Sequence, residues 1–243
     1  MDTSAAMGRL FGLDFNLAIV LTTTASAIIV FLIARAGAAA AISSVNSAAH
    51  APRGAQNFME WVIEFVRNVI GSTMDMKKGE RYLGLGVTII LYIFVSNMIG
   101  LPLTFVAGNE VWWTTPTADP HVTLSLSVAM IILTQIFGLR DLGVGGYLKS
   151  YLQPQAWMVP LNIIEQFASA LTLGMRLFGN MFAGGLLLGL LASAVYSGPF
   201  AMIGAAVPMI VWEMFSIFVG AIQSFVFLIL TMVYISHRIA VDH

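Results

Sequence analysis

The sequence predicts an all-α integral membrane protein with five transmembrane helices, the last two forming a long tilted hairpin, and one amphipathic membrane-surface helix. Of its 243 residues, 58% are hydrophobic and only 9% are charged, whereas a soluble domain carries roughly 25% charged residues. The resulting apolar runs reach about 20 residues, the length that crosses the hydrocarbon core. Basic residues gather in alternate loops, as expected of a chain that crosses repeatedly. We expect a single membrane domain over residues 1–243.

Composition also excludes several classes of function. The near-zero net charge of −1 argues against a nucleic-acid partner, whose phosphates attract a strongly basic protein. The absence of cysteine excludes a disulfide framework, thiol catalysis and cysteine-based metal sites. The sequence has no metal-ligand spacing, phosphate loop or nucleophile–base pair, and we expect neither a metal nor a cofactor.

The first crossing is expected over residues 14–35, a mainly apolar stretch that ends at Arg35. It lacks the basic start and the small-residue cleavage site of a signal peptide, so we expect the helix to be retained. Pro52 and Gly54 prevent the helix from continuing further.

Residues 56–73 predict a helix of another kind. Polar side chains recur there at helical spacing, and aromatic and aliphatic side chains cover the remaining surface. The polar set is Glu60, Glu64, Arg67 and Asn68. This amphipathic pattern favours the membrane surface or a partner protein over a crossing.

The second and third crossings are expected over residues 82–106 and 121–138. The second is interrupted late by Gly100 and Pro102, and the third ends at the sequence GLRD. The loop between them carries paired tryptophans, which are typical of an interfacial belt.

Two unusually long apolar segments follow, at residues 156–196 and 200–236. As single helices they would each be near 55–60 Å long, at ~1.5 Å per residue, about twice the hydrocarbon thickness. Each segment is therefore either two short spans or one steeply tilted helix. Their similar length and the Ser197-Gly198-Pro199 turn between them favour a tilted hairpin.

The distribution of basic residues predicts the orientation. Those between the first two crossings, between the third and fourth, and after the last are Arg35, Arg53, Arg67, Lys77, Lys78, Arg81, Arg140, Lys149 and Arg238. The loops at 107–120 and 197–199 contain no lysine or arginine. Because positive loops stay in the cytoplasm, we expect the N-terminus outside and the C-terminus cytoplasmic.

Three ionisable residues lie deep within apolar segments: Glu165, Arg176 and Glu213. A charge at the bilayer centre costs at least ~2.5 kcal/mol, so each needs a reason. One reading is structural, an arginine–glutamate pair that joins two helices, or a side chain that reaches the headgroups. Glu165 is near enough to the start of its segment to do the latter. Arg176 lies about 20 residues from either end, which makes that difficult.

Arg176 belongs to a polar stripe. On a helix with 100° per residue, five residues fall within a band about 80° wide. They are Glu165, Ser169, Thr172, Arg176 and Asn180. Beyond Asn180 the same face becomes apolar. Because the stripe is polar on just one side of the arginine, it suits a half-channel that ends at a charge. It does not suit a pore through the whole membrane.

The last segment repeats this pattern. Its polar face holds Glu213, Ser216, Gly220, Ser224 and Thr231, with Gln223 and Tyr234 beside it. Such side chains can hold water. The alternative is ordinary polar contact between helices, which serine, threonine and glutamine often provide.

The segments MRLFGNMFAGG around Arg176 and AIQSFVFLILTMVYIS near the C-terminus closely resemble subunit a of the rotary (F-type) ATP synthase membrane sector, in its bacterial form. Further matches, over nearly the whole chain, are QNFMEW, NMIGLP, the WW…PTAD loop and PLNIIE. The RLFGN element is very specific, and its pairing with the later GxIQxFxF run strengthens the resemblance.

The resemblance implies a proton-translocating stator subunit in a bacterial plasma membrane, which couples proton flow to ring rotation and ATP synthesis. Its partners would be a c-ring of small two-helix subunits, b-type peripheral stalk subunits and the lipid bilayer. The chain would be a non-catalytic subunit of an enzyme complex. Arg176 matches the essential arginine of the family, which separates two offset aqueous half-channels. A cation lowers the pKa of a nearby carboxylate, and arginine stays protonated when buried, so the ring acid must lose its proton before passing.

The resemblance also implies roles for the polar residues. Asn180 and Gln223 match positions that flank the arginine. By position, Glu165 and Thr172 would line the cytoplasmic half-channel, and the polar cluster of the last helix with Asn97 the outer one. The full set of half-channel residues is Glu165, Ser169, Thr172, Asn180, Glu213, Ser216, Gln223, Asn97 and Tyr234.

One departure from the family pattern concerns an acidic residue. Many bacterial relatives read RLFGN-xx-AGE, with a carboxylate nine residues after the arginine, where this chain has Gly185. The chain has Glu213 in the neighbouring segment instead. We hypothesise that Glu213 is the relocated carboxylate of the outer half-channel.

Two other classes remain beside the ATP synthase subunit. An unrelated ion channel or transporter is disfavoured by the one-sided stripes and by the lack of internal repeats. A structural membrane anchor would pair Arg176 with Glu213 or Glu165. The coupling ion is left open between H⁺ and Na⁺.

Overall fold

The computed structural model describes residues 4–5, 7–10, 13–45, 54–101, 105–107, 110–152, 159–195 and 199–239. Within these ranges the protein contains five helices long and apolar enough to cross a membrane. The helices are α1 (Leu17–Val45), α2 (Ala55–Thr73), α3 (Met76–Gly79), α4 (Leu83–Gly100), α5 (Pro120–Leu152), α6 (Val159–Val195) and α7 (Pro199–Ile239), with 3-10 turns η1 (Glu80–Tyr82) and η2 (Pro116–Ala118). The expected all-α membrane architecture is confirmed.

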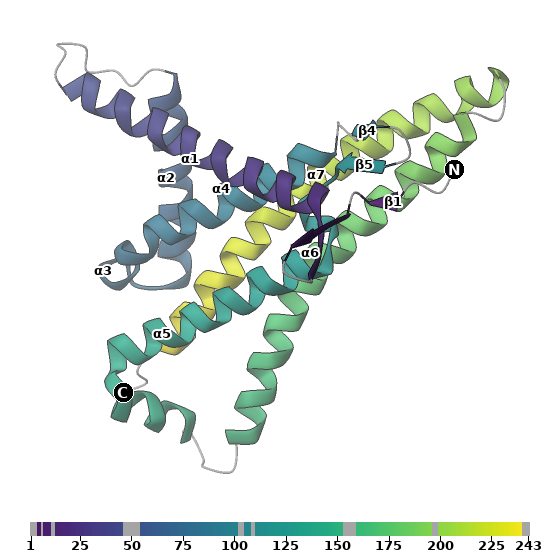
Figure 1. Ribbon diagram of the computed structural model, residues 1–243. Helices are drawn as coiled ribbons and strands as arrows, with labels where there is room; N and C mark the ends of the chain where they lie inside the picture. Colours follow the sequence, from purple (N-terminus) through teal and green to yellow (C-terminus); the bar gives the residue numbers. More distant parts are fainter. Residues whose placement is uncertain are drawn as a thin grey trace.

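The two long segments are each one continuous helix. α6 has 37 residues and α7 has 41. They pack against each other, and their connected ends project beyond the other helices (Figure 1). The arrangement is the hairpin that the sequence favours, and it removes the alternative of two short spans per segment.

The ends of α1 and the end of α4 differ from the expected ranges. α1 begins at Leu17 because Leu13–Asn16 form strand β3, and it continues to Val45, past Arg35. α4 ends at Gly100, and strand β4 occupies Phe105–Ala107, so the second crossing stops short of residue 106. The proline at 102 lies outside the described residues. Its lack of a backbone N–H, and the restriction it places on the preceding residue, disfavour a longer helix.

The third crossing continues past residue 138 to a break at Gly143, and a second helical segment then completes α5 to Leu152. Gly143 breaks it with a φ of 68° and a ψ of 170°. That backbone conformation suits glycine, which has no Cβ. The segment after Gly143 turns away from the main part of α5 (Figure 1).

Short strands that the sequence did not predict occur near the start of α1 and between α4 and α5. They are β1 (Ser4–Ala5), β2 (Met7–Leu10), β3 (Leu13–Asn16), β4 (Phe105–Ala107) and β5 (Glu110–Trp113). β5 pairs parallel with β1 and antiparallel with β4, while β2 and β3 form an antiparallel hairpin. The N-terminal segment is thereby joined to the loop between α4 and α5.

The core is built around the second half of α7. Phe227, Leu228, Met232 and Ile235 are completely buried. One cluster joins this half to α1, α2 and α4, and another joins it to α4 and α6. The first half of α7 is instead rich in exposed apolar side chains.

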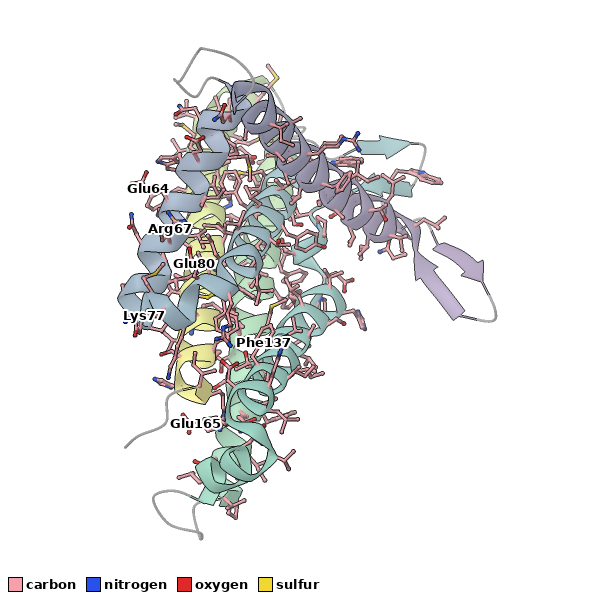
Figure 2. All side chains as sticks on the ribbon, turned by 90° about the vertical axis from the view of Figure 1, so that its left-hand side faces the viewer. Glu64, Arg67, Lys77, Glu80, Phe137 and Glu165 are labelled. Atoms are coloured by element: carbon pink, nitrogen blue, oxygen red, sulfur yellow. The ribbon has the colours of Figure 1, made fainter. Side chains whose placement is uncertain are left out.

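α2 is amphipathic, as predicted. Its buried residues are Val62, Val66, Val69 and Ile70, whereas Glu60, Glu64 and Arg67 are exposed. Glu64 and Arg67 lie on the outer side of the molecule (Figure 2). The apolar face of α2 packs against α1, α4 and α7.

Candidate functional site

Arg176 lies near the middle of α6 and is exposed. The side of α6 that packs against other helices is formed by Leu173, Gly174, Leu177 and Met181. Arg176 therefore lies next to the packed face of α6, and its side chain is not covered by the other helices of this chain. Among the described residues, neither Glu165 nor Glu213 forms an ion pair with it. This observation counts against the structural anchor, which needs such a pair.

The other polar residues of the α6 stripe follow the same uncovered side. Glu165 and Thr172 are exposed, and Ser169 is partly buried. Glu165 lies toward the end of the molecule at which α6 begins (Figure 2). The stripe thus faces outward along α6, and the other helices of this chain leave most of it open.

Asn180 connects the stripe to α7. Its Nδ2 donates a hydrogen bond to Oε1 of Gln223 over 3.0 Å. The Gln223 side chain is only 3% exposed, and its Nε2 has no partner among the described residues. Asn180 and Gln223, the two amides that the resemblance implies flank Arg176, are therefore joined across the two helices, 43 positions apart in the chain.

Asn97 forms a junction of three elements. Its Nδ2 donates to the carbonyl oxygen of Gly220 over 2.8 Å, and its Oδ1 accepts from the Thr117 hydroxyl over 2.7 Å. Asn97 and Thr117 are both fully buried. Asn97 therefore holds α4, η2 and α7 together. Thr117 was not predicted as a site residue, although it lies in the PTAD motif.

Four buried polar atoms on α4 and α7 have no hydrogen-bond partner within the described structure. They are the Ser96 hydroxyl, Oε1 of Glu213, the Ser216 hydroxyl and Nε2 of Gln223. An unsatisfied buried polar group costs about 1–3 kcal/mol, and bound water is its usual remedy. Ser96 is adjacent to Asn97 in the sequence. Asn97 was predicted as a site residue, and Ser96 was not. The set marks a region suited to ordered water.

The start of α7 is attached to α6 near Gly185. Nε1 of Trp212 donates to the carbonyl oxygen of Gly184 over 3.1 Å. The neighbouring residues Gly185 and Glu213 therefore lie at similar depth on the two helices. A Cβ at Gly185 would meet nothing within 4 Å, so the space that a carboxylate side chain would need is open.

Two hydroxyls of the predicted α7 face are satisfied within their own helix. Ser224 donates to the carbonyl oxygen of Ala221, and Thr231 to that of Phe227. Tyr234 is partly buried and packs against the cluster that joins α4, α6 and α7. The polar face of α7 is thus divided, and the unsatisfied atoms lie toward its N-terminal side.

An amide and phenol network near Glu165 was not predicted. Nε2 of Gln135 donates to Oε1 of Gln166, and the Tyr147 hydroxyl donates to Oε1 of Gln135 over 2.5 Å. The backbone turn at Gly143 returns Tyr147 toward α5. Because this turn depends on one glycine, spacing analysis could not reveal the contact.

The family described as ATP synthase A chain matches residues 19–236. The ATP synthase subunit a of Bacillus velezensis is 50% identical over 242 residues, covering 96% of each chain. That of Bacillus subtilis is 50% identical over 240 residues, again covering 96% of each. That of Bacillus pumilus is 49% identical over 251 residues and covers 100% of each.

Proposed function

This chain belongs to the ATP synthase A chain family, and on that premise we propose that it carries protons through two offset half-channels separated by Arg176. It is a multi-pass bacterial membrane protein and a membrane-sector subunit of ATP synthase, with partners inside that complex. These partners would be a ring of small subunits that carry a membrane carboxylate, and b-type stalk subunits.

The observation that carries the proposal is the exposed guanidinium of Arg176 in the middle of α6, which has no ion-pair partner among the described residues. A charged side chain left at the bilayer centre costs at least ~2.5 kcal/mol. Neither Glu165 nor Glu213 pairs with Arg176 within the described residues. Its counter-charge is therefore expected on another subunit. A carboxylate on a passing ring subunit would supply that charge and leave again.

The arginine would act on protons without carrying them. Because a cation favours the ionised form of a nearby carboxylate, a ring acid that approaches Arg176 releases its proton. Arginine keeps its own proton under all relevant conditions. A proton therefore cannot pass directly from one half-channel to the other. It must travel with the ring, and this requirement couples proton flow to rotation.

The two half-channels would lie on opposite sides of Arg176 along the hairpin. Glu165, Ser169 and Thr172 would line the cytoplasmic one, on the open stripe of α6. The unsatisfied polar atoms of α4 and α7 support a hydrated outer one, with Asn97 holding its walls together. The basic loops favour a cytoplasmic C-terminus and an external N-terminus.

Glu213 would be the acidic residue of the outer half-channel. The hydrogen bond between Trp212 and Gly184 supports this assignment, since it sets Glu213 level with the glycine that replaces the carboxylate of many relatives. Oε1 of Glu213 is buried and has no hydrogen-bond partner in the described part of the chain, which suits a group that exchanges protons with water.

Replacement of Arg176 by alanine tests the proposal. The complex should still assemble, because Arg176 makes no contact that holds the described fold together. ATP synthesis driven by a proton gradient in membrane vesicles should fall to the background of vesicles that lack the complex. The control is Arg35→Ala, which removes an exposed arginine from α1 and should leave synthesis unchanged. Coupled synthesis that persists in Arg176→Ala would overturn the proposal.

A further inference from the structure

A small pocket lies where η1 meets α5. It is lined by Arg81, Tyr82, Phe137, Arg140 and Asp141, and its volume is about 260 Å³. This volume is below the range of pockets for drug-sized ligands, and it is suited to a compact polar group. Phe137 marks its position in Figure 2.

The charge balance of the pocket favours an anion. Both oxygens of Asp141 are engaged: Oδ1 accepts from the Arg81 guanidinium over 2.5 Å, and Oδ2 accepts from the Tyr82 hydroxyl over 2.9 Å. Arg81 therefore neutralises Asp141. Arg140 is exposed and has no ion-pair partner among the described residues. One uncompensated guanidinium remains in the pocket, and guanidinium groups bind phosphate oxygens in a two-point geometry.

Further positive charge surrounds the pocket. Lys77 and Lys78 are exposed on α3, immediately before η1. Arg238, near the end of α7, lies close to this part of α5. A Cβ added at Gly138 would be 3.3 Å from the Cβ of Arg238. The potential at this end of the molecule attracts anions in general, and the pocket gives one of them a defined place.

The surroundings of the pocket identify the anion as part of a lipid. Tyr82 and Phe137 form an aromatic wall, with ring centroids 5.0 Å apart. The part of α5 that carries the pocket exposes large apolar side chains at Ile136 (50%) and Leu139 (41%). A free phosphate ion would make no favourable contact with that apolar surface, whereas an acyl chain would cover it.

We propose that this pocket binds the phosphate headgroup of an anionic phospholipid, with Arg140 as the main ligand and the apolar side of α5 in contact with an acyl chain. Basic pockets between transmembrane helices bind such headgroups. The site is independent of the proton path, because it contains none of the residues assigned to the half-channels. It would attach the junction of η1 and α5 to one lipid leaflet.

Native mass spectrometry of the full chain in detergent micelles, titrated with phosphatidylglycerol or with phosphatidylcholine, tests the proposal. Phosphatidylglycerol should bind more tightly than phosphatidylcholine, which has no net charge. Arg140→Gln should weaken phosphatidylglycerol binding by about fivefold, the effect of one basic residue at a lipid headgroup. Arg140→Lys keeps the charge and should recover part of that loss.

The matched control is Lys78→Gln, which removes one positive charge from the same end of the molecule but outside the pocket. It should leave the affinity near that of the original chain. Equal losses in Lys78→Gln and Arg140→Gln would overturn the site, since they indicate only a general surface potential. Equal binding of the two lipids would also overturn it. Displacement of phosphatidylglycerol by millimolar inorganic phosphate would assign the pocket to a free ion and contradict the lipid proposal.

Discussion

At the scale of residues, Arg176 and Glu213 are two ionisable side chains on adjacent helices whose polar groups lack a described partner. Arg176 is a charge on an uncovered helix face without a described acidic partner. Glu213 has one buried oxygen without a hydrogen-bond donor. An apolar environment penalises both conditions, so each residue needs something that the isolated chain does not provide. On the proposed function, Arg176 would gain a carboxylate on another subunit, and Glu213 would gain water.

The role of Glu213 leads to a specific prediction. In Glu213→Gln, ATP-driven proton pumping into inverted membrane vesicles should fall by about tenfold or more, because the amide cannot exchange a proton. The double variant Gly185→Glu/Glu213→Gln should recover much of the pumping, since the hairpin sets both positions at similar depth. Quenching of a pH-sensitive dye measures the pumping.

The control for this series is Glu60→Gln, which changes an exposed carboxylate on α2. It should pump like the original chain. If Glu213→Gln also pumps normally, Glu213 is not the relocated carboxylate. If Glu213→Gln fails and the double variant fails equally, the two positions are not equivalent.

At the scale of elements, the end of α4 is held by close packing. A Cβ at Gly100 would lie 2.3 Å from the backbone nitrogen of Thr115, so only glycine fits there without movement of the chain. Nε1 of Trp113 also donates to the carbonyl oxygen of Ile99 over 2.8 Å. The loop after β5 is thus pressed against the helix end. This contact also keeps Thr117 within reach of Asn97.

Gly100→Ala should therefore destabilise the protein by about 1–3 kcal/mol, the usual cost of overpacking. Gly84→Ala, on the same helix, is the matched control, because a Cβ there would meet nothing within 4 Å. That change should be neutral or stabilise by up to about 1 kcal/mol, since alanine restricts the unfolded chain. Thermal unfolding in detergent, followed by circular dichroism, measures both. Similar stabilities for the two variants would contradict the packing argument.

At the scale of the whole molecule, burial is unequal along the hairpin. The second half of α7 is at the centre of the core, with Phe227 and Leu228 fully buried. The first half exposes Met214 (68%) and Phe218 (60%), and α6 exposes Phe167 (72%). Surfaces of this size need lipid or another subunit. The exposed stripe of α6 and these apolar side chains would together form the contact with the ring.

This arrangement predicts which surfaces the ring protects. The chain has no cysteine, so single substitutions can be labelled cleanly. Phe218→Cys should react with N-ethylmaleimide in the detergent-solubilised chain and should react at least roughly tenfold more slowly after the purified ring is added, because a buried thiol is inaccessible. Ile28→Cys, on the exposed side of α1, is the control and should react at the same rate with and without the ring. Equal rates at Phe218→Cys with and without the ring would place the contact elsewhere.

The membrane class, the number of crossings and the polar stripe around Arg176 could be predicted from the sequence alone. Each depends on local information: the length of apolar runs, the rarity of charge within them, and the 100° step that aligns Glu165 with Asn180 on one helix face. The amphipathic character of α2 follows from the same periodicity. Such properties need no knowledge of the neighbouring helices.

Which polar groups meet and which stay without a partner follows from the packing of the helices and could not be predicted from the sequence. Asn97 and Gly220 are 123 positions apart, and Ser236 donates to the carbonyl oxygen of Thr73 from 163 positions away. Helix packing likewise decides three other features: the short strands, the turn at Gly143, and the similar depth of Glu213 and Gly185. Periodicity assigns a residue to a face of its own helix. It does not say which other helix covers that face, because packing is chosen by contacts among residues distant in the chain.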